Sequence, residues 1–254
     1  MDPFVFAAVL VAAACHASWN ASIKRTLDPL ATTTLIAIGA GLVALPAIPF
    51  LGWPELASWP WLIASIVIHL FYFAGLIESY RVGDLGQVYP IARGAAPLMT
   101  ATMTTVFIGE RLGVFGWGGI VMLAAGVLLL SLRGGRDLAK LDRVAVGFAL
   151  FTAVTVCAYS VVDGIGARAA GAGKAPAYTL VLFVGIAPVV VAYALLRRGY
   201  PVLPQMLPFW KIGLGGGALA VISYGIANWA MTVAPIAIVA ALMIVCGLML
   251  LRVA

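Results

Sequence analysis

The chain has 254 residues, of which 64% are hydrophobic and only 9% carry a formal charge. Soluble globular proteins typically contain about 25% charged residues, so this composition excludes a soluble fold and indicates an integral membrane protein. The net charge is +6, and the lysines and arginines lie in short polar connections. They form no patch of basic and aromatic residues, so no nucleic-acid partner is expected.

Nine apolar segments are long enough to cross a membrane, because a helix needs about 20 residues to span the hydrocarbon core. The predicted helices are 3–22, 31–50, 59–80, 86–108, 114–132, 144–165, 176–196, 211–231 and 234–251. Prolines inside several of them, including Pro46, Pro188 and Pro235, predict kinks. Since no alternation typical of strands is evident, the predicted fold class is all-α, a multi-pass membrane helical bundle.

The chain contains an internal repeat, in which one apolar unit occurs twice. Tyr89–Leu98 is echoed by Ala234–Leu242, and Met122–Leu130 is echoed by Met243–Leu251. The intervening residues of the first copy, 24 positions from 98 to 121, have no counterpart in the second. The second copy therefore lacks the end of one helix, a turn and the start of the next helix.

The longest polar connection, 133–143, divides the chain into a first unit, 1–133, and a truncated second unit, 143–254. Because the first unit has five helices, an odd number, the second must enter the membrane in the opposite sense. The predicted architecture is therefore an inverted repeat of two five-helix units, with nine spans here, and substrates of such proteins bind at the interface between repeats.

Lysines and arginines are concentrated on alternate connections. One set holds ten of them and the other set holds three, namely Arg111, Arg168 and Lys174. The positive-inside rule then predicts that the 133–143 connection is cytoplasmic and that the N-terminus lies outside.

Several short motifs occur in a characteristic order along the chain. They are His16–Asn20 followed by Lys24, Gly83–Asp84, Tyr89–Gly94 with Pro97, Gly109–Arg111, and Tyr159–Asp163 with Gly166 and Arg168. In these residues the chain resembles the drug/metabolite transporter superfamily, of the kind built from two EamA-type repeats. The resemblance implies ten helices and a second Gly-Glu-Arg-like turn, and this chain has neither.

Arg93 is the sharpest single candidate for a binding residue. It lies in an apolar run, where an unpaired guanidinium costs at least about 2.5 kcal/mol, so it should face protein or water. One interpretation is that Arg93 binds a carboxylate or phosphate of the substrate, helped by its planar bidentate geometry. The alternative is a structural ion pair with Glu78 or Asp163, or a position near the membrane interface.

Asp163 and Glu78 are the candidates for proton coupling. Asp163 follows Tyr159 by four residues, so both lie on one helix face, and burial disfavours the charged form of a carboxylate. The alternative for Asp163 is a pair with Arg168 or water at the interface. For Glu78, Arg81 three residues later favours a simple ion pair.

Polar and aromatic side chains form stripes on several predicted helices. Residues three or four positions apart lie on the same helix face, so each stripe occupies one face of its helix. A central cavity requires such polar faces, whereas a surface that contacts lipid avoids them. The predicted substrate-binding residues are His16, Trp19, Asn20, His69, Tyr72, Tyr89, Arg93, Tyr159, Tyr224 and Asn228. For any single stripe, hydrogen bonding between helices is the alternative. Glu110 and Arg111, in a short turn, are interpreted as structural.

The function predicted from these features is secondary transport, as efflux or exchange, of small polar or amphipathic metabolites by alternating access, with coupling to protons. The alternatives are a flippase for lipid-linked substrates, an accessory membrane subunit or a truncated remnant without transport activity. Enzyme motifs are missing from the sequence, so no enzyme, cofactor or metal site is expected. The expected partners are the lipid bilayer of the cell (inner or plasma) membrane and a small molecule with an anionic group, with a homodimer as an open alternative.

Overall fold

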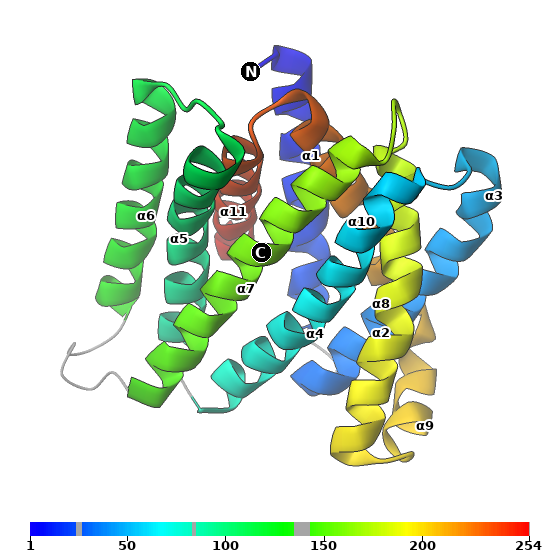
Figure 1. Ribbon diagram of the computed structural model, residues 1–254. Coiled ribbons are helices and arrows are strands. Elements are labelled where there is room, and N and C mark those ends of the chain that lie inside the picture. The colour runs from blue at the N-terminus through cyan, green and yellow to red at the C-terminus, as the bar shows by residue number, and fades with distance from the viewer. Residues whose placement is uncertain (24–26, 83–84, 135–142, 254) are drawn as a thin grey trace.

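A computed structural model of the protein describes the backbone of residues 1–23, 27–82, 85–134 and 143–253. Side chains are described over the same ranges except at 20–23, 79–82, 85–90, 93, 127–134 and 245–253. Nine long helices make up most of this described part (Figure 1). They are α1 (Pro3–Ile23), α2 (Pro29–Ala44), α4 (Trp59–Val82), α5 (Leu85–Met103), α6 (Val114–Gly134), α7 (Arg143–Ala169), α8 (Ala175–Arg198), α10 (Trp210–Val233) and α11 (Ile236–Val253).

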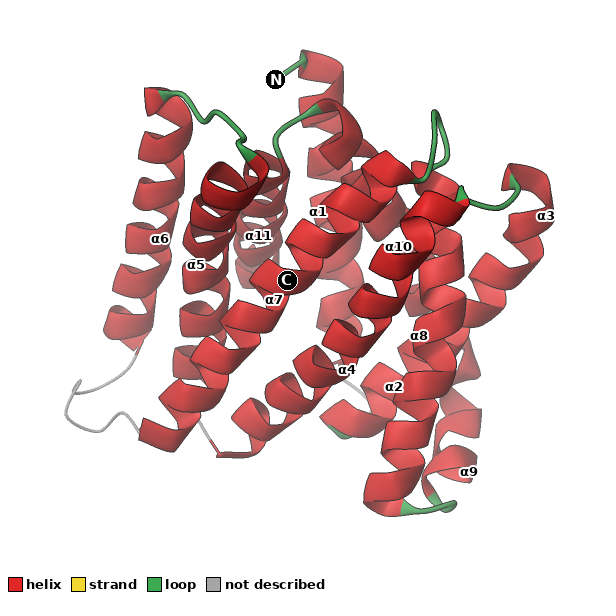
Figure 2. Ribbon diagram, in the orientation of Figure 1, coloured by secondary structure: helices red, strands yellow, loops and turns green. Residues whose placement is uncertain are grey.

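The fold class predicted from composition is confirmed. Figure 2 shows helices throughout the described residues, with no strand among them. Five helical stretches there are long and apolar enough to cross a membrane, namely Pro29–Leu51, Leu56–Glu78, Arg143–Ala169, Ala175–Arg198 and Val202–Val233. Shorter apolar stretches are Pro3–Trp19, Gly94–Ile108 and Val114–Gly126. The protein is therefore a multi-pass helical membrane protein.

Prolines interrupt the helices in different ways. Pro46 lies in a three-residue 3₁₀ turn, Leu45–Ala47, between α2 and the short helix α3 (Ile48–Leu51). Pro188 lies inside α8. Pro235, for which the sequence predicts a kink within a helix, instead stands in the break directly before α11, where its missing N–H costs no helical hydrogen bond.

The helices cross the bundle in alternating directions. In Figure 1 the connections between α5 and α6, α7 and α8, and α10 and α11 lie at the same end as the N-terminus. The connection from α3 to α4 also lies at this end, whereas the short helix α9 (Val202–Met206), which follows α8, lies at the opposite end. We call the two the N-terminal end and the α9 end of the bundle.

The helices of the two predicted units interleave. The closest neighbours are α4 with α7, α2 with α10, α1 with α10, and α5 with α7, each pair joining one helix of each unit. Matched in chain order, α1, α2, α4 and α5 of the first unit correspond to α7, α8, α10 and α11 of the second. The contact of α1 with α10 then corresponds to that of α7 with α4, and the contact of α1 with α11 corresponds to that of α7 with α5. This correspondence is what an inverted repeat requires. The packing of α5 against α6 has no such counterpart, since α11 is the last helix described.

Glycines bring α2 and α10 into close contact. A Cβ atom on Gly39 would collide with the carbonyl group of Gly213, and one on Gly217 would collide with the backbone of Gly39 and Ala40. Gly215, between them on α10, has no heavy atom near its Cβ position. The glycine cluster 213–217 thus permits close helix packing, as small residues do in membrane proteins.

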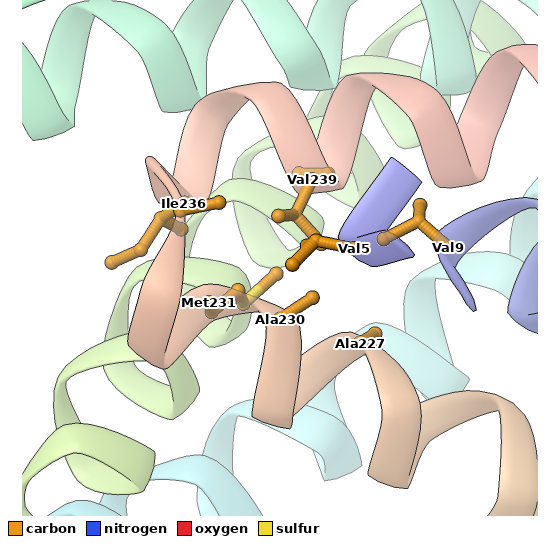
Figure 3. Packing of buried hydrophobic residues seen from close by; sticks show 9 residues of the cluster. Val5, Val9, Ala227, Ala230, Met231, Ile236 and Val239 are labelled. Atoms are coloured by element: carbon orange, nitrogen blue, oxygen red, sulfur yellow. The ribbon is translucent and has the colours of Figure 1, made fainter. Parts of the chain in front are cut away.

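A hydrophobic cluster joins α1 to the last two helices. Figure 3 shows Val5 and Val9 of α1 beside Ala227 and Ala230 of α10 and Val239 of α11. Val9, Ala230 and Val239 are fully buried. The small side chains let the three helices approach closely, and this holds α11 against the rest of the bundle.

Candidate functional site

A cavity of about 80 Å³ lies at the centre of the bundle. Its walls come from α1, α2, α4, α7, α8 and α10, so both predicted units contribute. The lining residues are His16, Trp19, Thr33, Ile36, Ala37, Ala40, His69, Tyr72, Phe73, Tyr159, Phe183, Ile186, Ala220 and Tyr224. Aromatic and aliphatic side chains dominate this lining, and two histidines and four hydroxyl groups provide its polar side chains.

Aromatic rings form a continuous network around the cavity. The His69 and Tyr159 rings stack with centroids 4.5 Å apart, and Tyr72 meets Tyr159 edge to face at 5.5 Å. Tyr224 contacts His69 and Phe183 at centroid distances of 6.0 and 5.8 Å. Edge-to-face and stacked contacts between aromatic rings are attractive, and they fix the orientations of these rings. The positions of the side chains in the cavity wall are therefore held by their neighbours.

Six of the ten predicted binding residues line this cavity: His16, Trp19, His69, Tyr72, Tyr159 and Tyr224. Asn228 instead lies beside it, 1% exposed, and donates a hydrogen bond of 2.9 Å to the Thr179 hydroxyl. The side chains of Asn20, Tyr89 and Arg93 lie outside the described residues.

A buried carboxylate lies behind the cavity wall. Asp163 of α7 is 1% exposed, and it is the only Asp or Glu among the buried residues that the structure describes. It accepts hydrogen bonds from the hydroxyl of Tyr224 at 2.5 Å and from the hydroxyl of Tyr178 at 2.9 Å. Asp163 therefore joins α7 to α8 and α10, and the alternative considered from the sequence, a pair with Arg168, does not form.

His69 and Ser65 of α4 complete this cluster. Both side chains are buried, and the His69 ring interacts electrostatically with Asp163. His69 Nδ1 lies 2.9 Å from the Ser65 carbonyl oxygen and 3.2 Å from the Ser65 hydroxyl oxygen. We call Ser65, His69, Asp163, Tyr178 and Tyr224 the Asp163 cluster. Burial of so many polar groups is tolerated because each has a hydrogen-bond partner.

One polar atom in the cavity wall has no hydrogen-bond partner in the described part of the chain. The indole Nε1 of Trp19 is buried, and it has no hydrogen-bond acceptor among the residues that the structure describes. A buried donor without an acceptor costs about 1–3 kcal/mol. Trp19 is thus suited to donate a hydrogen bond to a molecule that enters the cavity.

Glu78, the second predicted proton carrier, lies away from the cavity lining. It forms an ion pair with Arg197 of α8 near the α9 end of the bundle. Its side chain is 16% exposed. The partner expected from the sequence, Arg81, lies outside the described side chains. Glu78 thus joins α4 to α8 across the two predicted units.

Sequence reasoning missed two walls of the cavity, those formed by α2 and by α8, and two polar partners. The α2 wall consists of small or aliphatic residues, such as Ala37 and Ala40, that form no polar stripe. Tyr178, which binds Asp163, lies near the start of α8 outside any predicted stripe. Ser65 could have been found, because it precedes His69 by four residues and so shares its helix face.

A second carboxylate, Glu110, lies at the N-terminal end of the bundle. Gly109 ends the turn Thr104–Ile108 in the left-handed conformation, with φ of 75°, and this turns the chain toward α11. Glu110 accepts hydrogen bonds from the Ile236 backbone N–H at 3.1 Å and from Arg168 at 2.6 Å.

Arg168 links Glu110 to the end of α10. It donates further hydrogen bonds to the carbonyl oxygens of Met231 at 2.9 Å and Ala234 at 3.3 Å. Glu110 therefore caps the first turn of α11, while Arg168 caps the last turn of α10. We call this pair the Glu110 clamp.

A helical membrane bundle around an internal cavity is an architecture typical of membrane transporters. The comparison with known families agrees. The family model of EamA-like transporters matches residues 4–132, and the chain belongs to this family.

Two curated relatives have names that describe transport. An uncharacterized transporter from Sinorhizobium sp., encoded in the cobO 3′ region, is 33% identical over 112 residues, which cover 44% of this chain and 74% of that protein. The spermidine export protein MdtI of Klebsiella pneumoniae is 31% identical over 70 residues, which cover 28% of this chain and 64% of that protein.

Proposed function

We propose that the protein is a secondary transporter that exports or exchanges small polar or amphipathic metabolites by alternating access of its two units, 1–133 and 143–254, in the cell membrane. The observation that carries this proposal is the aromatic cavity at the interface of the two units, with a buried carboxylate behind its wall. The pairwise correspondence of helix contacts between the units supports the division, and so does the family match, which ends at residue 132.

Contacts between the units lie at both ends of the bundle. The Glu110 clamp joins the connection before α6 and the end of α7 to α10 and α11 at the N-terminal end. Ion pairs of Arg197 with Glu78 and of Arg198 with Asp28 join α8 to the first unit at the α9 end. A cavity of about 80 Å³ is smaller than the 300–1,000 Å³ typical of ligand sites, so substrate entry must widen it and break the contacts at one end.

The described cavity wall favours a substrate with a protonated amine. Aromatic faces attract organic cations, and Asp163, when it is ionised, supplies a negative charge beside Tyr224. One relative is named as a spermidine exporter, which is consistent with this preference. The opposite prediction, an anionic substrate bound by Arg93, concerns a side chain that the structure does not describe, and it requires its own test.

Asp163 is proposed as the group that couples transport to protons. A buried carboxylate beside a substrate cavity can bind either a proton or a cation, and the exchange of one for the other couples their movements. Glu78, already in an ion pair with Arg197, is the weaker candidate for this role.

A matched pair of probes tests the substrate class. Phenylethylamine and phenylacetate carry the same aromatic ring with opposite charges, and their uptake is measured in proteoliposomes under a pH gradient. We expect uptake of phenylethylamine and of spermidine at least tenfold above that of empty vesicles, with no uptake of phenylacetate. Absence of all uptake would contradict the proposal.

Uptake of phenylacetate alone would instead support the anionic class. Arg93→Ala should then abolish that uptake while leaving the melting temperature unchanged, because the guanidinium would be the group that binds the carboxylate. Unchanged phenylacetate uptake by Arg93→Ala would exclude the binding role of Arg93.

An apolar groove favours lipid flipping as a second candidate function. The groove has a volume of about 330 Å³ and lies between α8 and α10, and its walls include Pro176, Leu180, Val221, Ile222 and Trp229. A groove of this kind on membrane-spanning helices suits an acyl chain. Flipping of a fluorescent phospholipid, measured by its quenching with dithionite, should match that of empty vesicles if the protein carries soluble metabolites only.

A further inference from the structure

Asp163 does not line the cavity, although it lies directly behind the wall. Its side chain is 1% exposed, and two of the residues that line the cavity, Tyr224 and His69, interact with its carboxylate. The shortest route for a proton between the cavity and Asp163 therefore runs through one of these two side chains.

Tyr224 is poorly suited to carry that proton. Its hydroxyl already donates its hydrogen to Asp163 at 2.5 Å. A phenol, with an ordinary pKa of about 10, does not readily release a proton near neutral pH, whereas an imidazole, with an ordinary pKa of about 6.5, exchanges one easily. The chemistry of the two side chains thus favours His69.

The contacts of His69 assign different tasks to its two ring nitrogens. Nδ1 is 2.9 Å from the Ser65 carbonyl oxygen, which can only accept, so the neutral ring carries its hydrogen on Nδ1. The ring is held in place by stacking on Tyr159. Nε2 is then the nitrogen with a free lone pair, and His69 belongs to the cavity wall.

The Ser65 hydroxyl connects Nδ1 to Asp163. It lies 3.2 Å from His69 Nδ1, and it also interacts with the Asp163 carboxylate. We propose that His69 relays protons between the cavity and Asp163 through the Ser65 hydroxyl, a role that rests on the proposed proton coupling by Asp163.

The transfer balances in both directions. On proton uptake, an N–H bond forms at His69 Nε2 and the N–H bond at Nδ1 breaks. The proton released from Nδ1 goes to the Ser65 oxygen, and the original Ser65 proton forms an O–H bond on Asp163. On proton release the steps reverse: the O–H bond on Asp163 breaks and its proton goes to the Ser65 oxygen, the Ser65 proton forms the N–H bond at Nδ1, and the Nε2 proton leaves for the cavity, which restores the first tautomer. No oxidant or further reactant is required.

Other ionisable groups surround this path in the described part of the molecule. They are His16 on α1, Tyr72 on α4, Tyr159 on α7, Tyr178 on α8 and Tyr224 on α10. All are neutral near pH 7 except where His16 gains a proton. Asp163 is therefore the negative group that a protonated His69 faces.

Nuclear magnetic resonance tests the relay without knowledge of the substrate. The chain has only two histidines, His16 and His69, so labelling histidine with ¹⁵N gives two sets of ring signals, and His16→Gln assigns them. We expect the Nδ1–H tautomer for His69 at high pH, with protonation at Nε2 as the pH falls. Asp163→Asn should move the midpoint by at least about one pH unit to lower pH, because the protonated ring loses its carboxylate partner.

Ser65→Ala provides a second variant should Asp163→Asn fail to fold. Loss of the hydroxyl removes the connection to Asp163 but leaves the Ser65 carbonyl as the Nδ1 partner. We expect the tautomer to persist and proton exchange at His69 to slow at least tenfold in relaxation measurements. A His69 ring with its hydrogen on Nε2, or one whose titration is the same in wild type and Asp163→Asn, would overturn the relay.

A transport measurement separates the relay from the proposed function. His69→Asn keeps a donor that can reach the Ser65 carbonyl but cannot titrate. We expect it to lower pH-driven phenylethylamine uptake at least tenfold while exchange of the same probe at equal pH falls by less than about threefold. Equal pH-driven uptake by His69→Asn and wild type would overturn the relay and leave the proposed function intact. Absence of pH-driven uptake in wild type would contradict proton coupling itself, and the tautomer of His69 would still be measured independently.

Discussion

Asp163 and Glu110 are both carboxylates that hold helices together, yet their surroundings differ. Glu110 faces Arg168 and the N-terminal N–H of α11, so a permanent cation and a helix dipole both balance its charge. Asp163 faces two tyrosine hydroxyls, and the neighbour among the described residues that can carry a positive charge is His69, a titratable side chain. A permanent cation balances Glu110, whereas only a titratable side chain can balance Asp163.

This difference separates a structural role from a functional role. The Glu110 clamp lies at the end of the bundle, where it caps two helices and joins the units. The Asp163 cluster lies beside the cavity, where a change in charge alters what the cavity attracts. The three substitutions below test whether the two carboxylates differ in this way.

Asp163→Asn should have the largest effect. It removes the charge while keeping the size, so one of the two tyrosine hydroxyls keeps an acceptor oxygen and the other can accept a hydrogen bond from the amide N–H. We expect pH-driven amine uptake in proteoliposomes to fall at least a hundredfold, with the protein still folded in detergent by size-exclusion chromatography and thermal unfolding. Uptake that keeps its response to the pH gradient would contradict the functional role of Asp163.

Glu110→Ala should act on stability instead. The Ile236 N–H and the Arg168 guanidinium lose their acceptor, and each unpaired polar group costs about 1–3 kcal/mol where it is buried. Because the Arg168 side chain is 34% exposed, the lower part of that range applies to it. The melting temperature should fall by roughly 5 °C.

Transport provides the control for the Glu110 substitution. Uptake corrected for the amount of folded protein should stay within about threefold of wild type, with the same pH dependence. A loss of pH response in Glu110→Ala would show that the clamp is not purely structural, and the contrast with Asp163 would then fail.

Tyr178→Phe should have the smallest effect. Tyr178 is fully buried, and the substitution removes only one of the two hydroxyls that bind Asp163. Because a hydrogen bond donated to a carboxylate favours the ionised form, its loss should move the pH midpoint of uptake upward by up to about one unit. Asn228→Ala, which removes a neighbouring buried bond that does not reach Asp163, is the matched control and should leave the midpoint unchanged.

The helices were more predictable than the site. Apolar runs of about 20 residues and prolines at their ends are local signals, and the predicted boundaries agree closely with the nine long helices described. The stripes of His16 with Trp19 and of His69 with Tyr72 were found because residues three or four apart share a helix face. Their convergence on one cavity could only be inferred, since it depends on how helices far apart in sequence rotate about their axes.

The partners of the ionisable groups could not be read from local spacing. Arg81 follows Glu78 by three residues, but the structure shows a pair of Glu78 with Arg197, 119 residues away. Arg168 follows Asp163 by five residues, yet it binds Glu110. In each case a neighbouring helix brings a partner into contact that the sequence places far away.

The sequence by itself determined that this is a multi-pass helical membrane protein, and it predicted two related units, because hydropathy, helix period and internal repetition are properties of the chain alone. Only the tertiary structure decided which carboxylate is balanced by a permanent cation and which is left among tyrosines and a histidine. The physical reason is that the charge state of a buried group depends on the dipoles and charges packed around it, and here these come from helices that are distant in sequence.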